Sequence, residues 1–123
     1  MIEGLIIGHC NIGEAVMNVL ESISGSSNNL YFLSNDGLST KELVQKINTV
    51  SAAAQENGLF IFVDIYGGSC WQAAKIADFK QKHIITGFNL PVLISFINKR
   101  EKFSFDELTE VLENDAKRGI IIE

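Results

Sequence analysis

The sequence has no apolar run long enough to cross a membrane. Its longest continuous apolar run, Leu59–Val63, has the length of a strand, whereas a membrane-spanning helix needs about 20 apolar residues. Residues 1–4 also lack the basic charge that opens a secretion signal. We therefore expect a cytoplasmic protein.

Cysteine and basic charge are also scarce. The two cysteines, Cys10 and Cys70, are too few for a disulfide framework, and we expect free thiols in a reducing cytoplasm. The chain has 10 Lys and Arg residues against 15 Asp and Glu residues, a formal net charge of -5. A nucleic-acid binder would instead show clustered basic residues, so we expect no nucleic-acid partner.

What the chain does have is short apolar runs separated by polar segments. Its 123 residues, 46% of them hydrophobic, predict one domain, residues 1–123, with a single core. The apolar runs do not alternate with polar residues, which is typical of strands buried on both faces of a parallel sheet. These runs are Leu5–Ile7, Leu30–Leu33, Leu59–Val63, Ile84–Ile85 and, at the end of the chain, Ile120–Ile122.

Helical periodicity fills the segments between the runs. Apolar residues recur at helical spacing in Val16–Ile23, Leu43–Ala54, Ala73–Ala77, Leu93–Ile97 and Leu108–Leu112. Helix starts are predicted by capping boxes or by an early proline at Ser39/Glu42, Ser69/Gln72, Pro91 and Ser104/Glu107. The alternation predicts an α/β fold: a doubly wound, mostly parallel sheet of four strands plus a C-terminal edge strand, with helices on both faces.

Residues that carry chemistry follow two of the predicted strands. Ligands of open α/β sheets bind beyond the carboxyl ends of the strands. His9 comes shortly after the first apolar run, Asp64 directly follows the third, and the turn Gly67–Ser69 then opens a predicted helix. We expect these residues to meet at one edge of the sheet. His83, at the start of its strand, should lie at the opposite edge.

A histidine, a carboxylate and a helix N-terminus together suit phosphoryl transfer through a phosphohistidine. Neutral imidazole is a good nucleophile, and a carboxylate bonded to one ring nitrogen fixes the tautomer and leaves the other nitrogen free to attack. Asp64 would orient His9 in this way and balance the charge of the phosphorylated ring. Backbone N–H groups at Gly67, Gly68 and Ser69 would hold the phosphoryl oxygens.

Each of these features also has a purely structural interpretation. A lone histidine after a strand is often a surface residue, Asp64 is a common type of turn former, and a Gly-Gly-Ser segment often only turns the chain. The Gly-Lys-Ser of a P-loop is absent. His9, Asp64 and Cys10 are candidate metal ligands, but no standard zinc spacing is present, so we assign no metal and no cofactor.

At the same residues the sequence resembles the mannose-family (mannose/fructose/sorbose) IIA domains of the sugar phosphotransferase system. The resemblance rests on Gly8-His9 followed by Gly13-Glu14-Ala15, on Phe62–Ser69 and on Gly87–Leu93, in the same order along nearly the whole chain. It implies a phosphotransferase component in which His9 accepts a phosphoryl group from the phosphocarrier HPr, with Asp64 as its partner residue. It also implies donation to a IIB domain that phosphorylates the incoming sugar, an indirect IIC/IID membrane permease partner, and a homodimer that exchanges its last strand.

Three residues depart from the family's usual pattern. Cys10, Cys70 and Gln72 stand where the family typically has Gly, Pro and Asn, which leaves the partner surface and the sugar class open. The chain ends just after Ile122, so we expect a free-standing IIA without a fused IIB. Two other functions stay open: the phosphoryl-donor subunit of a dihydroxyacetone kinase, and a non-catalytic regulator of the same fold, which the two cysteines motivate.

Overall fold

The computed structural model describes residues 1–123 and confirms the predicted alternation of strands and helices. The elements, in chain order, are β1 (Glu3–Gly8), α1 (Ile12–Ser24), β2 (Leu30–Ser34), α2 (Thr40–Asn48), α3 (Ala52–Asn57), β3 (Leu59–Val63), α4 (Gly68–Ile76), β4 (Lys82–Thr86), α5 (Leu90–Lys99) and α6 (Glu107–Arg118). No helix combines the length and the apolar character needed to span a membrane.

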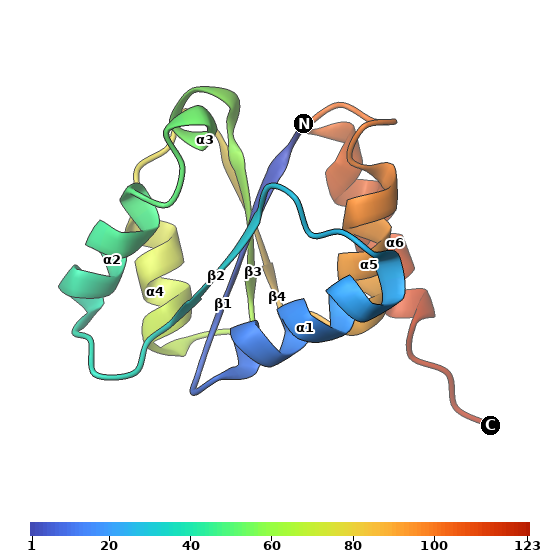
Figure 1. Ribbon diagram of the computed structural model, residues 1–123, viewed down its shortest axis with the longest axis horizontal. Helices are drawn as coiled ribbons and strands as arrows, with labels where there is room; N and C mark the ends of the chain where they lie inside the picture. Colours follow the sequence, from blue (N-terminus) through green and yellow to red (C-terminus); the bar gives the residue numbers. More distant parts are fainter.

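The four strands form one sheet in the order β2-β1-β3-β4, and every neighbouring pair is parallel. Helices α2, α3 and α4 cover one face, and α1, α5 and α6 cover the other (Figure 1). Each face of the sheet has its own apolar core, so the prediction of a single core is wrong: the sheet divides the buried residues into two clusters. Successive residues of a strand point to opposite faces, so Leu5 and Ile7 enter one core while Ile6 enters the other. This double burial explains why the central strands β1 and β3 are apolar without alternation.

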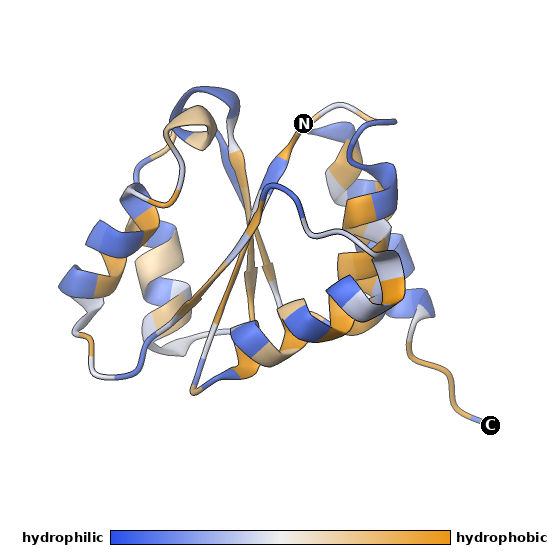
Figure 2. Cartoon of the chain, viewed as in Figure 1, coloured by the Kyte–Doolittle hydropathy of each residue, from blue (hydrophilic) through white to orange (hydrophobic).

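The predicted C-terminal edge strand is absent, so the sheet has four strands and is entirely parallel. Residues Ile120–Ile122 leave α6 and extend away from the body (Figure 1), where they form an apolar tail (Figure 2). Their exposures are 71%, 76% and 93%. High strand propensity does not make a strand without another strand to pair with, and no strand of the same chain pairs with this segment.

The predicted helix over Leu43–Ala54 is in fact two helices. The capping box at the start of α2 is confirmed, since Ser39 and Glu42 bond each other's backbone N–H groups at 3.1 and 3.0 Å. The break comes at Ser51, whose hydroxyl accepts from the Ala54 N–H at 3.2 Å and donates to Glu3 at 2.8 Å. Serine thus competes with the helical backbone for hydrogen bonds and starts α3.

Two further predicted helix starts are confirmed. Ser104 and Glu107 form a reciprocal capping box ahead of α6, with distances of 2.9 and 3.2 Å. Pro91 lies in the first turn of α5, and Asn89 caps that helix by accepting from the Val92 N–H at 2.9 Å. The fixed φ of proline suits this position, where its missing N–H is not needed.

Candidate functional site

The carboxyl end of the sheet brings His9 and Asp64 into direct contact. Their strands, β1 and β3, are neighbours, and the Asp64 N–H extends the pairing by donating to the Ile7 carbonyl at 3.2 Å. The Asp64 Oδ2 atom accepts from the His9 backbone N–H at 2.9 Å and lies 2.8 Å from His9 Nδ1. The Asp64 side chain is 11% exposed and the His9 side chain 45% exposed. The carboxylate therefore lies under an accessible imidazole.

Hydrogen bonds keep the Asp64 carboxylate ionised. Burial by itself raises the pKa of Asp64, but the bonds from the His9 backbone and ring and from the Ile65 N–H outweigh it, so the pKa is lower than that of an ordinary aspartate. The Ile65 N–H reaches the second oxygen, Oδ1, at 3.0 Å. An ionised partner on Nδ1 favours the tautomer with its proton on that nitrogen, which leaves the lone pair of Nε2 free.

The turn Gly67–Ser69 forms the start of α4, as predicted, but not by the predicted mechanism. Gly67 is the N-cap residue, and no side chain caps this end of the helix. The predicted capping box between Ser69 and Gln72 is therefore wrong. Ser69 lies already inside the first turn. Gly67 (φ +82°, ψ −175°) and Gly68 (φ +75°) adopt backbone angles that other residues rarely accept. The first N–H groups of a helix have no acceptor within it, so they are available to an anion.

Asn35 belongs to the same edge and was missed in the sequence. Its side-chain amide donates to the Ser69 hydroxyl at 3.1 Å, and its backbone N–H donates to the Gly8 carbonyl at 3.3 Å. Asn35 therefore ties the end of β1 to the start of α4. Asn35 directly follows the strand that ends at Ser34. The rule that ligands bind beyond the carboxyl ends of strands therefore indicates Asn35 as well as His9 and Asp64.

The two cysteines lie in different environments. Cys10 is exposed and has a positive φ of 54°, in the region that favours glycine. Cys70 is buried in the first turn of α4, with 1% of its surface exposed. Burial, and then the charge of Asp64, raise the pKa of Cys70 to about 11. At neutral pH the Cys70 side chain is therefore a neutral thiol.

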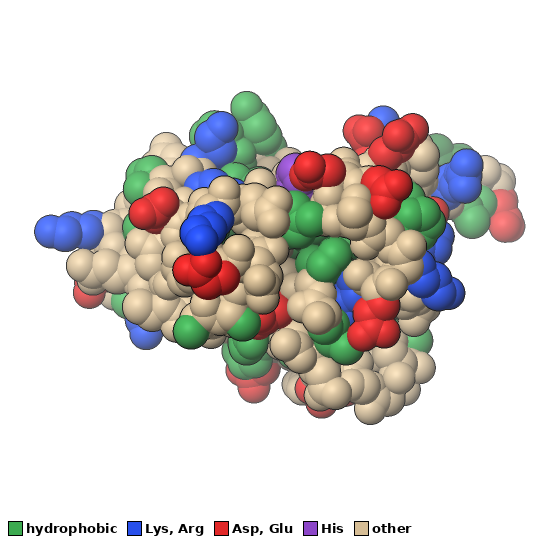
Figure 3. Space-filling view, turned by 90° about the horizontal axis from the view of Figure 1, so that it is seen from above, with side chains coloured by type: hydrophobic (Ala, Val, Ile, Leu, Met, Phe, Trp, Pro, Cys, Tyr) green, Lys and Arg blue, Asp and Glu red, His purple; other side chains and the backbone are tan.

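The second histidine lies at the opposite end of the sheet, as predicted. His83 is near the start of β4, and its Nε2 atom lies 2.9 Å from Asp106 Oδ1. Figure 3 looks onto this end of the molecule, where acidic and basic side chains are interspersed and no continuous basic surface is visible. His83 is therefore separated from the residues around His9 by the length of the strands.

Two comparisons by sequence found related proteins. The sequence model of the EIIA-man family, described as PTS system fructose IIA component, matches residues 4–113. The PTS system fructose-specific EIIA component of Bacillus subtilis (strain 168) is 29% identical over 119 residues, covering 92% of this chain and 80% of that protein.

Solved structures show the same fold. The phosphotransferase system component EIIA from Streptococcus agalactiae matches with a TM-score of 0.87 at 22% identity, covering 99% of this chain and 97% of that chain. The mannose/sorbose specific IIA subunit from Enterococcus faecalis matches with a TM-score of 0.83 at 16% identity, covering 99% and 94%. Because the family match spans most of the sequence, this chain belongs to the EIIA-man family and is a mannose-family IIA phosphocarrier component of the phosphotransferase system, with HPr and a IIB domain as its partners.

Proposed function

We propose that this phosphocarrier bears its phosphoryl group on Nε2 of His9. The observation that carries the proposal is the 2.8 Å contact between His9 Nδ1 and the Asp64 carboxylate. It leaves the other ring nitrogen as the nucleophile of a side chain that is 45% exposed. An exposed nucleophile suits a protein that must exchange its phosphoryl group with two other proteins in turn.

The transfer follows from the groups around this nitrogen. Nε2 attacks the phosphorus of phospho-HPr, a nitrogen–phosphorus bond forms, and the bond to the donor breaks. The ring then carries positive charge, which the Asp64 carboxylate balances. The N–H groups at the start of α4 and the Ser69 hydroxyl are the proposed donors to the phosphoryl oxygens, with the helix dipole in support. Donation to a IIB domain reverses these steps.

We also propose that the sugar is fructose or a close relative, and that the transfer takes place in the cytoplasm and feeds a IIC/IID permease. The support is the description of both the family and the Bacillus subtilis relative as fructose components. The same descriptions favour a sugar system over a dihydroxyacetone kinase. The intact pair of His9 and Asp64 favours a phosphocarrier over a non-catalytic regulator.

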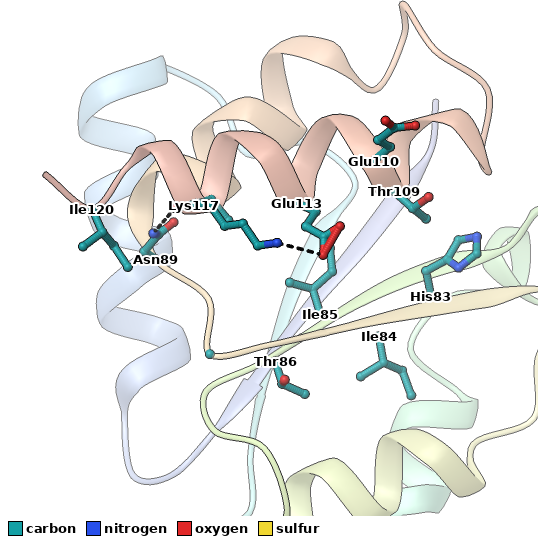
Figure 4. A pocket seen from close by; sticks show the side chains of 12 residues that line it. His83, Ile84, Ile85, Thr86, Asn89, Thr109, Glu110, Glu113, Lys117 and Ile120 are labelled. Atoms are coloured by element: carbon teal, nitrogen blue, oxygen red, sulfur yellow. Dashed lines mark hydrogen bonds and ion pairs between the residues drawn. The ribbon is translucent and has the colours of Figure 1, made fainter.

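We also propose that the protein is a homodimer. Strand β4 pairs only with β3, so its other edge is free. An open groove of about 720 Å³ lies between β4 and α6 (Figure 4), with Ile84, Ile85 and Ile120 among its lining residues. We propose that Ile120–Ile122 of each subunit pairs with β4 of the other, because an unpaired edge and an exposed apolar segment then cover each other.

Incubation with enzyme I, HPr and labelled phosphoenolpyruvate tests the phosphocarrier role. We expect label on this protein in the complete mixture and none when HPr is left out. A protein that stays unlabelled while HPr itself becomes labelled would support the regulator instead.

A further inference from the structure

Three side chains that can bind a metal ion converge at the edge of the sheet. His9, Asp64 and Cys70 each offer one donor atom, and these atoms lie within 4.8 Å of one another. Around a tetrahedral zinc ion the donor atoms are about 3.3–3.7 Å apart, given bond lengths of about 2.0–2.3 Å. The donor atoms are therefore at most about 1.5 Å farther apart than the spacing around one zinc ion.

We propose that this site binds one zinc ion, or a similar divalent cation, through His9, Asp64 and the sulfur of Cys70, and that the ion and the phosphoryl group exclude each other. Imidazole nitrogen, carboxylate oxygen and thiolate sulfur are the donors that zinc prefers. A water molecule would complete the tetrahedron. On binding, the Cys70 thiol loses its proton to solvent, a sulfur–zinc bond forms, and the aqua ion releases the displaced water molecules.

The placement of the three ligands supports a defined site. They come from the end of β1, the end of β3 and the first turn of α4. Cys70 is buried and His9 is accessible, so the ion can enter from the His9 side and reach the thiol beneath. The remaining Asp64 oxygen, Oδ1, accepts from the Ile65 N–H at 3.0 Å, an outer contact of the kind that orients metal ligands.

The sequence did not predict this site, because its ligands are far apart along the chain. His9 and Asp64 are separated by 55 positions, and no standard zinc spacing connects them. Cys10, the thiol considered from the sequence, follows His9 directly but is exposed and does not join the cluster. The fold selects Cys70 instead.

Mutual exclusion follows from the chemistry of the imidazole ring, and it rests on the proposed function of His9. A metal ion on Nε2 occupies the lone pair that would attack phosphorus. A metal ion on Nδ1 displaces the proton onto Nε2, which then has no lone pair to donate. In both cases Asp64 is also withdrawn from its contact with the ring. The ion would therefore act as a reversible inhibitor of phosphoryl transfer.

Cobalt titration tests the site without any phosphoryl transfer. A cobalt–thiolate bond gives an intense near-ultraviolet charge-transfer absorption, and zinc should abolish it by displacement. We expect the band in the wild type and in the matched control Cys10→Ser, and not in Cys70→Ser or Cys70→Ala, whose fold is checked by circular dichroism. Because loss of an outer contact alone costs 10–100-fold in metal affinity, Cys70→Ala should weaken cobalt binding at least about 100-fold.

The same variants test the exclusion. Purified phospho-HPr is mixed with each protein with and without zinc, and each rate is compared with that of the same protein free of metal. Zinc should slow transfer to the wild type and Cys10→Ser, and a chelator should restore the rate. The transfer rate of Cys70→Ala should not change with zinc.

Absence of the cobalt band from the wild type, or an equal band in Cys70→Ala, would overturn the metal site and leave the proposed function standing. A normal band with no transfer to the metal-free wild type would overturn the proposed function alone.

Discussion

At the scale of single residues, Asp64 has the best-defined role. We predict that Asp64→Asn lowers the rate of phosphoryl transfer from phospho-HPr by about 10²- to 10⁴-fold, the usual effect of losing an orienting or general-base group. An amide cannot balance positive charge on the ring and can select the wrong tautomer. Quenched-flow measurement of phosphoprotein formation gives the rate.

The chain offers a matched control for this substitution. Asp106 is also within 2.9 Å of a histidine nitrogen, that of His83, but at the opposite end of the sheet. Asp106→Asn should leave the transfer rate unchanged. Equal rates for Asp64→Asn and the wild type would mean that Asp64 only ends its strand.

Asn35 should act on transfer through Ser69. Its amide donates to the Ser69 oxygen at 3.1 Å, which leaves the hydroxyl proton of Ser69 free to donate to another group. We predict that Asn35→Ala slows transfer about 5- to 10-fold, the value of one hydrogen bond of about 1–1.5 kcal/mol. A double-mutant cycle measures the connection.

In that cycle, Asn35→Ala should have little further effect once Ser69 is already alanine. Full additivity of the two effects would show that Asn35 acts independently of Ser69, and the contact would then be structural only.

At the scale of the elements, the turn before α4 sets the direction of the helix N-terminus. Gly67 (φ +82°) and Gly25 (φ +76°, after α1) both have positive φ, and a Cβ at either would meet no atom within 4 Å. We predict that alanine at either position costs about 1–3 kcal/mol of unfolding free energy through backbone strain alone. Only Gly67→Ala should also slow transfer, by about 10- to 100-fold, because it displaces the phosphoryl donors.

Urea unfolding and the transfer assay, applied to both variants, separate these effects. A Gly25→Ala protein that loses transfer as strongly as Gly67→Ala would show that the loss follows from stability and not from the turn.

The elements themselves were largely predictable, and the exceptions have physical causes. Four apolar runs became four strands, and the pattern is clearest in β1 and β3, which are buried on both faces. Because ligands of parallel sheets bind beyond the carboxyl ends of the strands, the sequence also predicted that His9 lies beside Asp64. The break at Ser51 combines a local cap with a bond to Glu3, 48 positions away, and a local pattern cannot contain the second bond. The partnership of Asn35 with Ser69, 34 positions apart, was hidden for the same reason.

At the scale of the whole molecule, the free edge of β4 and the apolar tail predict the oligomeric state. We expect a dimer at tens of micromolar, and monomers after deletion of residues 120–123. The deletion keeps Gly119, which lies close against Pro91. Sedimentation equilibrium measures both proteins.

Substitution by a charged residue gives the matched comparison. Ile121→Asp should weaken the dimer, whereas Ile76→Asp, at an isoleucine that is 62% exposed on α4, should not. A 123-residue chain that remains monomeric would rule out exchange of the tail between subunits.

The most direct test of the account is the identity of the phosphorylated residue. Wild type, His9→Ala and His83→Ala are each incubated with enzyme I, HPr and labelled phosphoenolpyruvate, and the label is mapped by peptide analysis under alkaline conditions, where phosphohistidine is stable. We predict acid-labile label on the wild type and His83→Ala and none on His9→Ala, which should fold normally because the His9 side chain is 45% exposed. Label that persists in His9→Ala, or that maps to His83, would contradict the account.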